Sequence, residues 1–241
     1  MFERKDYLLT MITQMAEAIA TRISKLRKEK KHAEALAELG ELYGRMQLPP
    51  SKLLGSVPEE DALRMMMTGA SLSGEKLLAA GKLLREEADI YEEMSGEREA
   101  YQRRVNALYF YLTAEELGAK SDDVSLHAEI AYLNHRLKAY RQPAAVLYKL
   151  MEYCCAAGSY DEAENLLYEL KGRDFSGDGE LPERGLAFYR RLLACSDEKL
   201  QAGKLPRDEV EAGLREWQAA WPRLSAGGTG TAAPSGAESA G

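Results

Sequence analysis

The chain has 241 residues, of which 45% are hydrophobic and 29% are charged, a composition typical of globular proteins with a sizeable core. Its formal net charge of −7 disfavours nucleic acid as a partner, because phosphate binding needs a concentrated positive surface. Three cysteines without metal-ligand spacing, a charged N-terminus and no long apolar run predict a cytoplasmic protein without a disulfide framework, a secretory signal or a membrane span.

Residues 1–47 predict an amphipathic helical hairpin. In a first helix over 3–29, apolar residues recur every three or four positions and form one stripe: Leu8, Ile12, Met15, Ile19, Ile23 and Leu26. A second helix over 32–46 places a similar set on its inner face: Ala35, Leu36, Leu39, Leu42 and Tyr43. We expect this hairpin either to cap a repeat array or to mediate self-association.

The first helix ends in the basic stretch RISKLRKEKK, residues 22–31. Cations are favoured at a helix C-terminus by the helix dipole, so a solvated helix end is one interpretation. Contact with a partner protein, a membrane surface or RNA is the other. The apolar stripe lacks the Trp and Phe of interfacial helices, which disfavours the membrane.

Prolines, glycines and serines interrupt the helical pattern over 48–73, and we interpret this segment as a connector with one or two short helices. Pro49 and Pro50 end the preceding helix. Ser56 followed by Glu59 fits a capping box that opens a short helix through Met66.

Residues 74–222 predict a series of helices separated by short loops, so neighbouring helices should pack antiparallel. The expected helices span 74–94, with Ser73 as the cap, and then 97–118, 122–140, 143–157, 160–172, 182–201 and 206–220. The final segment, 223–241, is small and polar and cannot bury enough apolar surface to offset its ordering entropy, so we expect it to be disordered.

Two windows share a helix–turn–helix spacing. In the first, Gly158 permits a tight turn, Ala163 permits close helix approach, and four leucines fill the space between helices: Leu147, Leu150, Leu167 and Leu170. In the second window, 81–114, the matching positions are Leu84, Ala88, Tyr91, Ala100 and Ala107. The spacing resembles the tetratricopeptide repeat, from which Met151, Cys154, Ser95 and Arg104 depart. The resemblance implies an all-α fold of antiparallel helix pairs in a short right-handed superhelix.

The opening MFERKDYLLTMITQMAEAIA and residues 71–112, SLSGEKLLAAGKLLREEADIYEEMSGEREAYQRRVNALYFYL, are similar to an uncharacterised protein family of Gram-positive bacteria. This resemblance covers about the first 120 residues. It supports a helical-repeat fold and implies no activity or catalytic residue.

In tetratricopeptide proteins the first helix of each pair lines a concave surface that holds an extended peptide or a partner helix. The template places the following residues on that surface: Lys82, Arg85, Asp89, Glu92, Tyr148, Glu152 and Cys155. Arg85 would pair with a ligand carboxylate, and Tyr148 would offer an amphipathic contact. The competing interpretation is a solvated helix face with no ligand.

Motifs for catalysis or metal binding are not evident in the sequence. His127 and His135 are two helical turns apart without a completing ligand, and the only GGTGT run lacks the lysine of a phosphate loop. We therefore predict a non-catalytic protein- or peptide-binding scaffold without metal or cofactor. The alternative is a regulatory sensor that binds a small ligand or peptide in the same groove.

Overall fold

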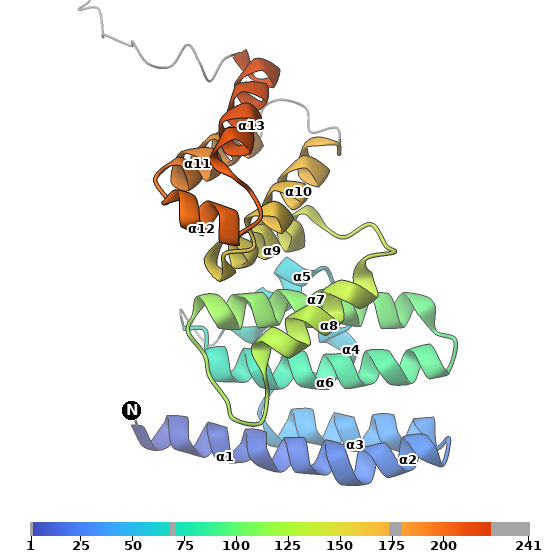
Figure 1. The fold of residues 1–241 in the computed structure, drawn as a ribbon. Helices are drawn as coiled ribbons and strands as arrows, with labels where there is room; N and C mark the ends of the chain where they lie inside the picture. Colours follow the sequence, from blue (N-terminus) through green and yellow to red (C-terminus); the bar gives the residue numbers. More distant parts are fainter. Residues whose placement is uncertain (1, 68–70, 174–179, 223–241) are drawn as a thin grey trace, which may run out of the picture. The chain divides into compact units, whose positions relative to one another are not determined.

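The computed structural model describes residues 2–67, 71–173 and 180–222, and every element of more than three residues in them is a helix (Figure 1). The α-helices are α1 (Phe2–Ala18), α2 (Ser24–Lys28), α3 (His32–Arg45), α4 (Ser51–Leu54), α5 (Glu59–Met66), α6 (Gly74–Glu93), α7 (Glu97–Glu116), α8 (Leu126–Leu137), α9 (Ala144–Ala157), α10 (Tyr160–Lys171), α11 (Leu181–Leu193), α12 (Asp197–Ala202) and α13 (Arg207–Ala220), with a π-helix η1 (Ile19–Ile23) between α1 and α2. The predicted all-α class is confirmed.

The chain divides into two compact units, Met1–Leu150 and Met151–Gly241. Within the first unit, antiparallel helix pairs predominate, and α6 packs against α1, α3 and α7 (Figure 1). The expected disorder of 223–241 concerns residues outside those that the structure describes.

The first helix runs without a break from α1 through η1 to α2, close to its predicted span. Its predicted apolar stripe is buried at Ile12, Met15, Ile19 and Ile23. No feature of the sequence predicts the π segment. Here the amide of Ser24 donates to the carbonyl of Ile19, five residues back, instead of four.

The connector contains two short helices, α4 and α5. The predicted capping box is wrong, because α5 begins at Glu59 with Pro58 at its N-cap and without a side-chain cap. The hydroxyl of Ser56 instead donates to the carbonyl of Leu53 at 3.2 Å.

Polar side chains of α7 hold the connector in place. The amide of Asn106 donates to the carbonyls of Leu54 at 2.5 Å and Val57 at 2.9 Å. Arg103, beside it, donates through Nε to Glu87 Oε2 at 2.7 Å, and both side chains are almost fully buried. Burial raises the pKa of Glu87 despite its hydrogen bonds from Ser51 and Arg103.

The pair α6–α7 is the most extensive helix contact in the first unit. Ser73 caps α6 by accepting from the amide of Lys76 at 3.3 Å, as predicted. Gly81 on α6 faces the ring of Tyr111 on α7, and a Cβ at this position would lie only 2.9 Å from Tyr111 Cε1. The glycine therefore allows the two helices to approach closely.

Helix α8 is shorter than the predicted 122–140, because it starts at Leu126, where Ser125 accepts from the amide of Ala128 at 3.4 Å. Upstream of this cap, Asp123 accepts a hydrogen bond from Thr13 Oγ1 at 2.6 Å. The segment before α8 therefore contacts α1, and α8 itself packs on α7.

The second unit has an aromatic core between α11 and α13. The ring of Trp217 is fully buried, and its Nε1 donates to the carbonyl of Pro182 at 2.9 Å. A Cβ on Gly185 would overlap the six-membered ring of Trp217, so only glycine fits there. Phe188 and Tyr189 pack edge to face at 5.0 Å in the same core.

The predicted helix 182–201 is two helices, α11 and α12, because Ser196 caps α12 by accepting from the amide of Lys199 at 3.4 Å. The guanidinium of Arg207 donates to the carbonyls of Leu193 at 3.1 Å and Cys195 at 2.6 Å. These bonds satisfy carbonyls that α11 leaves unpaired at its C-terminus.

Candidate functional site

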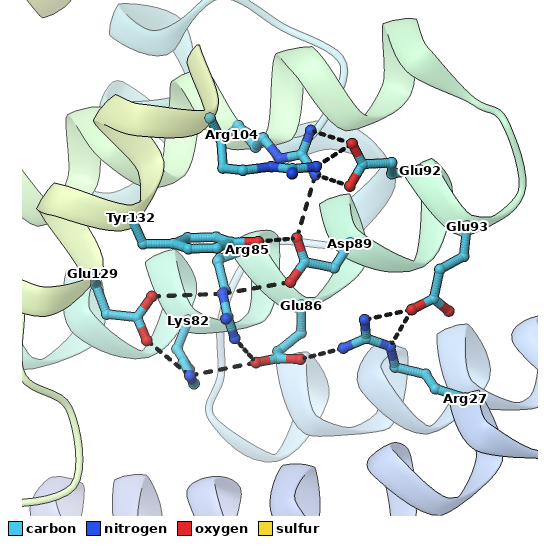
Figure 2. Close-up of polar contacts among 11 residues, drawn as sticks. Arg27, Lys82, Arg85, Glu86, Asp89, Glu92, Glu93, Arg104, Glu129 and Tyr132 are labelled. Atoms are coloured by element: carbon cyan, nitrogen blue, oxygen red, sulfur yellow. Dashed lines mark hydrogen bonds and ion pairs between the residues drawn. The ribbon is translucent and has the colours of Figure 1, made fainter. Parts of the chain in front are cut away.

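Charged side chains from four helices meet along one face of α6 (Figure 2). We call this group the charged cluster. Its cations are Arg27, Lys82, Arg85, Arg104 and Arg136, its carboxylates are Glu86, Asp89, Glu92, Glu93 and Glu129, and Tyr132 adds a hydroxyl. The five cations and five carboxylates balance one another in charge.

Helix α6 supplies six members of the charged cluster because their positions repeat at helical spacing. Lys82, Arg85, Glu86 and Asp89 follow one another at intervals of three, one and three residues and therefore share one face. Arg27 comes from α2, Arg104 from α7, and the remaining three members come from α8. Side chains from α8 thus reach the face of α6 on which the predicted binding residues lie.

Arg85 lies at the centre of the charged cluster. Its Nη1 donates to Glu86, and its Nε is 3.6 Å from both Asp89 Oδ2 and Glu129 Oε2. The ring of Tyr132 lies 4.7 Å from the guanidinium carbon, a cation–π distance. Burial alone would lower the pKa of Arg85, but the surrounding carboxylates outweigh it and raise the pKa, so the guanidinium stays charged.

Arg104 is the most buried cation of the charged cluster, with a side chain only 4% exposed. Its Nη2 donates to Glu92 Oε2 at 2.7 Å and to Asp89 Oδ1 at 3.3 Å. The hydroxyl of Tyr132 donates to the same Asp89 oxygen at 2.8 Å. Burial raises the pKa of Tyr132, and the Asp89 carboxylate raises it further, so this hydroxyl remains a donor.

The side chains of the charged cluster become more exposed to solvent from Glu86 towards Glu92. The side chain of Glu86 is 5% exposed and that of Glu92 is 46% exposed. Arg27 bridges these parts, since it contacts Glu86 Oε2 at 3.1 Å and Glu93 Oε1 at 2.6 Å. We call the outer residues Arg27, Glu92, Glu93 and Arg136 the rim, where charges of both signs reach solvent.

Some buried atoms of the charged cluster lack a hydrogen-bond partner in the structure: the Nε atoms of Arg85, Arg104 and Arg136, and Oε2 of Glu129. Unpaired buried polar atoms are uncommon in native proteins and call for an explanation. The many ion pairs of the charged cluster thus leave these four buried atoms without a hydrogen bond.

The structure brings together four of the predicted site residues. Lys82, Arg85, Asp89 and Glu92 all belong to the charged cluster, and each is engaged by a side chain of the same chain. Lys82, for example, contacts Glu129 of α8 at 2.8 Å. Peptide binding by these residues stays a prediction, and it would involve competition with α8.

The other three predicted residues lie on α9. Tyr148 is half-buried, and Glu152 is exposed and accepts from Arg191 Nη1 at 2.8 Å. Cys155 is buried, and burial raises the pKa of its thiol to about 11, so it is a poor nucleophile at neutral pH. Their role in binding likewise stays a prediction.

The predicted site did not include the cluster members outside α6, although Arg27 lies in the basic stretch 22–31. Arg104 occupies a position where the repeat template expects an inward aromatic residue, and this departure was the one available signal. Glu129, Tyr132 and Arg136 repeat at intervals of three and four residues on α8, which resembles any solvated helix face. Only the packing of α8 against its neighbours reveals their shared partner.

The described residues hold no group of three or more His, Cys, Asp or Glu side chains arranged to bind a metal ion. Within the same ranges, none of the helices has the length and apolar character to cross a membrane.

Comparison with known proteins assigns the chain to one family. Residues 1–221 match the model of a family of unknown function, DUF6483. The chain belongs to this family, which agrees with the predicted resemblance to an uncharacterised family. Neither the curated proteins nor the solved structures contain a match.

Proposed function

We propose that the protein is a non-catalytic scaffold that binds another protein or a peptide, and that the rim of the charged cluster is its contact surface. The observation that carries this proposal is the gradient of exposure along the cluster. Glu92 and Glu93 are 46% and 37% exposed, whereas the arginines that hold them are more buried. The inner ion pairs thus fix the outer carboxylates in place for a partner.

The energetics of buried charge support a role beyond stability. Removing charged groups from water is costly, and apolar side chains of similar volume often stabilise a fold as well or better. A cluster of ten charged residues along α6 is therefore a poor device for stability alone. Alternating charges with fixed positions favour recognition of a complementary surface, because they reject partners with the wrong charge pattern.

Ion pairs with more than one cation hold the inner carboxylates of the charged cluster. Glu86 and Asp89 each contact two cations or more. These ion pairs fix the positions of both carboxylates, which suits recognition of a surface with complementary charges.

The finer fold assignment belongs to the same proposal. We infer that α6–α7 and α9–α10 are tetratricopeptide-like pairs in an irregular superhelical array. Support comes from Gly158, which adopts a φ of +80° in the turn before α10, and from Ala88 and Ala163, which are fully buried. The pair α6–α7 runs from residue 74 to 116 and is longer than the usual repeat of about 34 residues.

Crosslinking capture with charge-reversed bait tests the proposed surface. The full chain should enrich a specific protein from a lysate of its source cells, and Glu92→Lys should reduce that recovery strongly. Glu183→Lys on α11 is the matched control, since Glu183 is also an exposed glutamate on a helix. Far-UV circular dichroism checks that both variants are folded.

Two results would count against the proposal. Equal recovery by the wild type and Glu92→Lys would show that the rim is not the contact surface. If no protein is enriched over an unrelated helical bait, the scaffold function itself is wrong.

A further inference from the structure

A groove runs along the outer surface of the N-terminal hairpin, between α3 and the helix formed by α1 and η1. Its volume is about 330 Å³. We call it the N-terminal groove, and its lining consists of Met11, Gln14, Met15, Glu17, Ala18, Thr21, Arg22, Leu42, Arg45 and Met46. Met15, Leu42 and Met46 are buried at its floor, and Met11 and Ala18 are half-buried. The other lining residues are polar and exposed.

The π-helix η1 lies beside this groove. Ile19 and Ile23 of η1 are buried in the hairpin, while Thr21 and Arg22 line the groove. Short π segments are rare within α-helices and are frequently found at functional sites. The π segment therefore marks the region around Ile19–Ile23 as the part of the hairpin where a functional contact is most expected.

The exposed surface around η1 is complementary to itself. An acid, Glu17, precedes η1, and a base, Arg22, lies five residues later. Between them Ala18 and Thr21 line the groove and are small, so another helix can approach closely. Within the described residues Glu17 makes no ion pair, and Arg22 has only a surface contact with Glu38 at 3.3 Å.

We propose that a second copy of this chain docks in the N-terminal groove through its own α1–η1 segment. An antiparallel arrangement about a two-fold axis between Ile19 and Ala20 places Glu17 of each copy opposite Arg22 of the other. A two-fold interface makes every contact twice, so one acid and one base per chain give two intermolecular ion pairs. Met11, which lines the groove and is half-buried, supplies an adaptable apolar contact to the incoming helix.

Charge complementarity favours a second copy over an unrelated partner. A uniformly acidic helix would leave Glu17 facing like charge, and a uniformly basic helix would do the same to Arg22. The antiparallel copy presents both signs in the required order. This inference does not depend on the rim of the charged cluster, and the two proposals can fail separately.

Sedimentation velocity of the full chain tests this inference. Across protein concentrations from about 1 to 100 µM the mass should rise towards twice 26.8 kDa, because dimer content follows protomer concentration. Glu17→Arg and Arg22→Glu should each raise the dimer Kd by at least about tenfold, the factor that corresponds to ~1.4 kcal/mol. The chain carrying both changes should recover most of the affinity, because the ion pairs re-form with their signs exchanged.

Glu183→Arg provides the control, as a charge reversal at an exposed site on α11 that should leave the dimer Kd unchanged. A wild-type chain that remains monomeric at the highest concentration would overturn the inference. A dimer that is insensitive to both single reversals would place the interface elsewhere. If both single changes weaken the dimer but the double change fails to restore it, the antiparallel pairing of Glu17 with Arg22 is wrong.

Discussion

The α6–α7 pair and the α11–α13 pair bury very different side chains at their contacts. Between α6 and α7, Glu87 and Arg103 form an ion pair whose side chains are 2% and 6% exposed. Between α11 and α13, Trp217 fills the space left by the absent side chain of Gly185. The Glu87–Arg103 contact depends on charge and hydrogen-bond geometry, whereas the packing of Trp217 on Gly185 depends on shape.

Because of this difference, substitutions should destabilise the two pairs in different ways. A buried charge whose partner is removed keeps its desolvation cost, so single substitutions should be worse than paired apolar ones. An aromatic ring against a glycine responds to volume, so a cavity or an added methyl group should be the damaging change.

Trp217→Ala should have the largest effect, a loss of about 4 kcal/mol in the free energy of unfolding, because it leaves a ring-sized cavity and an unpaired carbonyl at Pro182. Urea unfolding followed by far-UV circular dichroism measures this loss. Trp221→Ala is the matched control, since Trp221 is half-buried and its removal should cost much less. Equal losses in the two variants would contradict an aromatic core centred on Trp217.

Arg103→Met should destabilise the protein by about 3 kcal/mol, because Glu87 remains buried without its cationic partner. Adding Glu87→Leu should then recover most of the loss, since both charges are replaced by apolar groups. The measurement is the urea midpoint of each single variant and of the double variant. If the double variant is as unstable as the sum of the two single variants, the contact is not selected by charge in the way that we describe.

Gly185→Ala should cost about 2 kcal/mol, because the added Cβ would overlap Cε2 and Cζ2 of Trp217. In a Trp217→Phe background these two atoms are absent, so the same substitution should cost much less. A double-mutant cycle from urea unfolding gives the coupling between the two sites. Additive costs would show that the glycine is required for another reason.

The sequence predicts helices well where apolar spacing and caps are both clear. Ser73 opens α6 as predicted, and the stripe from Ile12 to Ile23 is buried. The errors occur where two local signals for the start of a helix compete. Pro58, and not Ser56, occupies the N-cap position of α5. The expected helix 182–201 is interrupted because Ser196 is the N-cap of α12.

The sequence predicted part of the charged cluster, on α6, but not the contribution of α8. The spacing of Lys82, Arg85 and Asp89 placed them on one face of a helix, and they do share that face. The sequence contained no sign that α8 supplies Glu129 and Tyr132 to the same face, because their spacing suits any amphipathic helix. The partner of a charged side chain depends on packing between helices, which periodicity within one helix does not encode.

Glu164 in the second unit, like Glu87 of α6, has a pKa raised by burial, and its titration gives the smallest predicted effect. Burial raises the pKa of Glu164, and the nearby Glu209 and Glu216 raise it further, while the hydrogen bond from Tyr189 at 2.7 Å opposes them. The pKa of Glu164 in the folded protein therefore exceeds the ordinary value of 4.5. The folded state binds this proton more tightly than the unfolded state does.

It follows that protonation of Glu164 favours folding, and that this contribution is lost as the pH rises from 4.5 through the raised folded-state pKa. Glu164→Gln removes the titration and keeps an oxygen that accepts from Tyr189. Urea unfolding of both proteins over this pH range should show the wild type losing stability relative to the variant as the pH rises. A difference that does not change with pH would mean that Glu164 is as well solvated when folded as when unfolded. The stability of the second unit would then depend on the shape complementarity of its aromatic core and not on a buried acid.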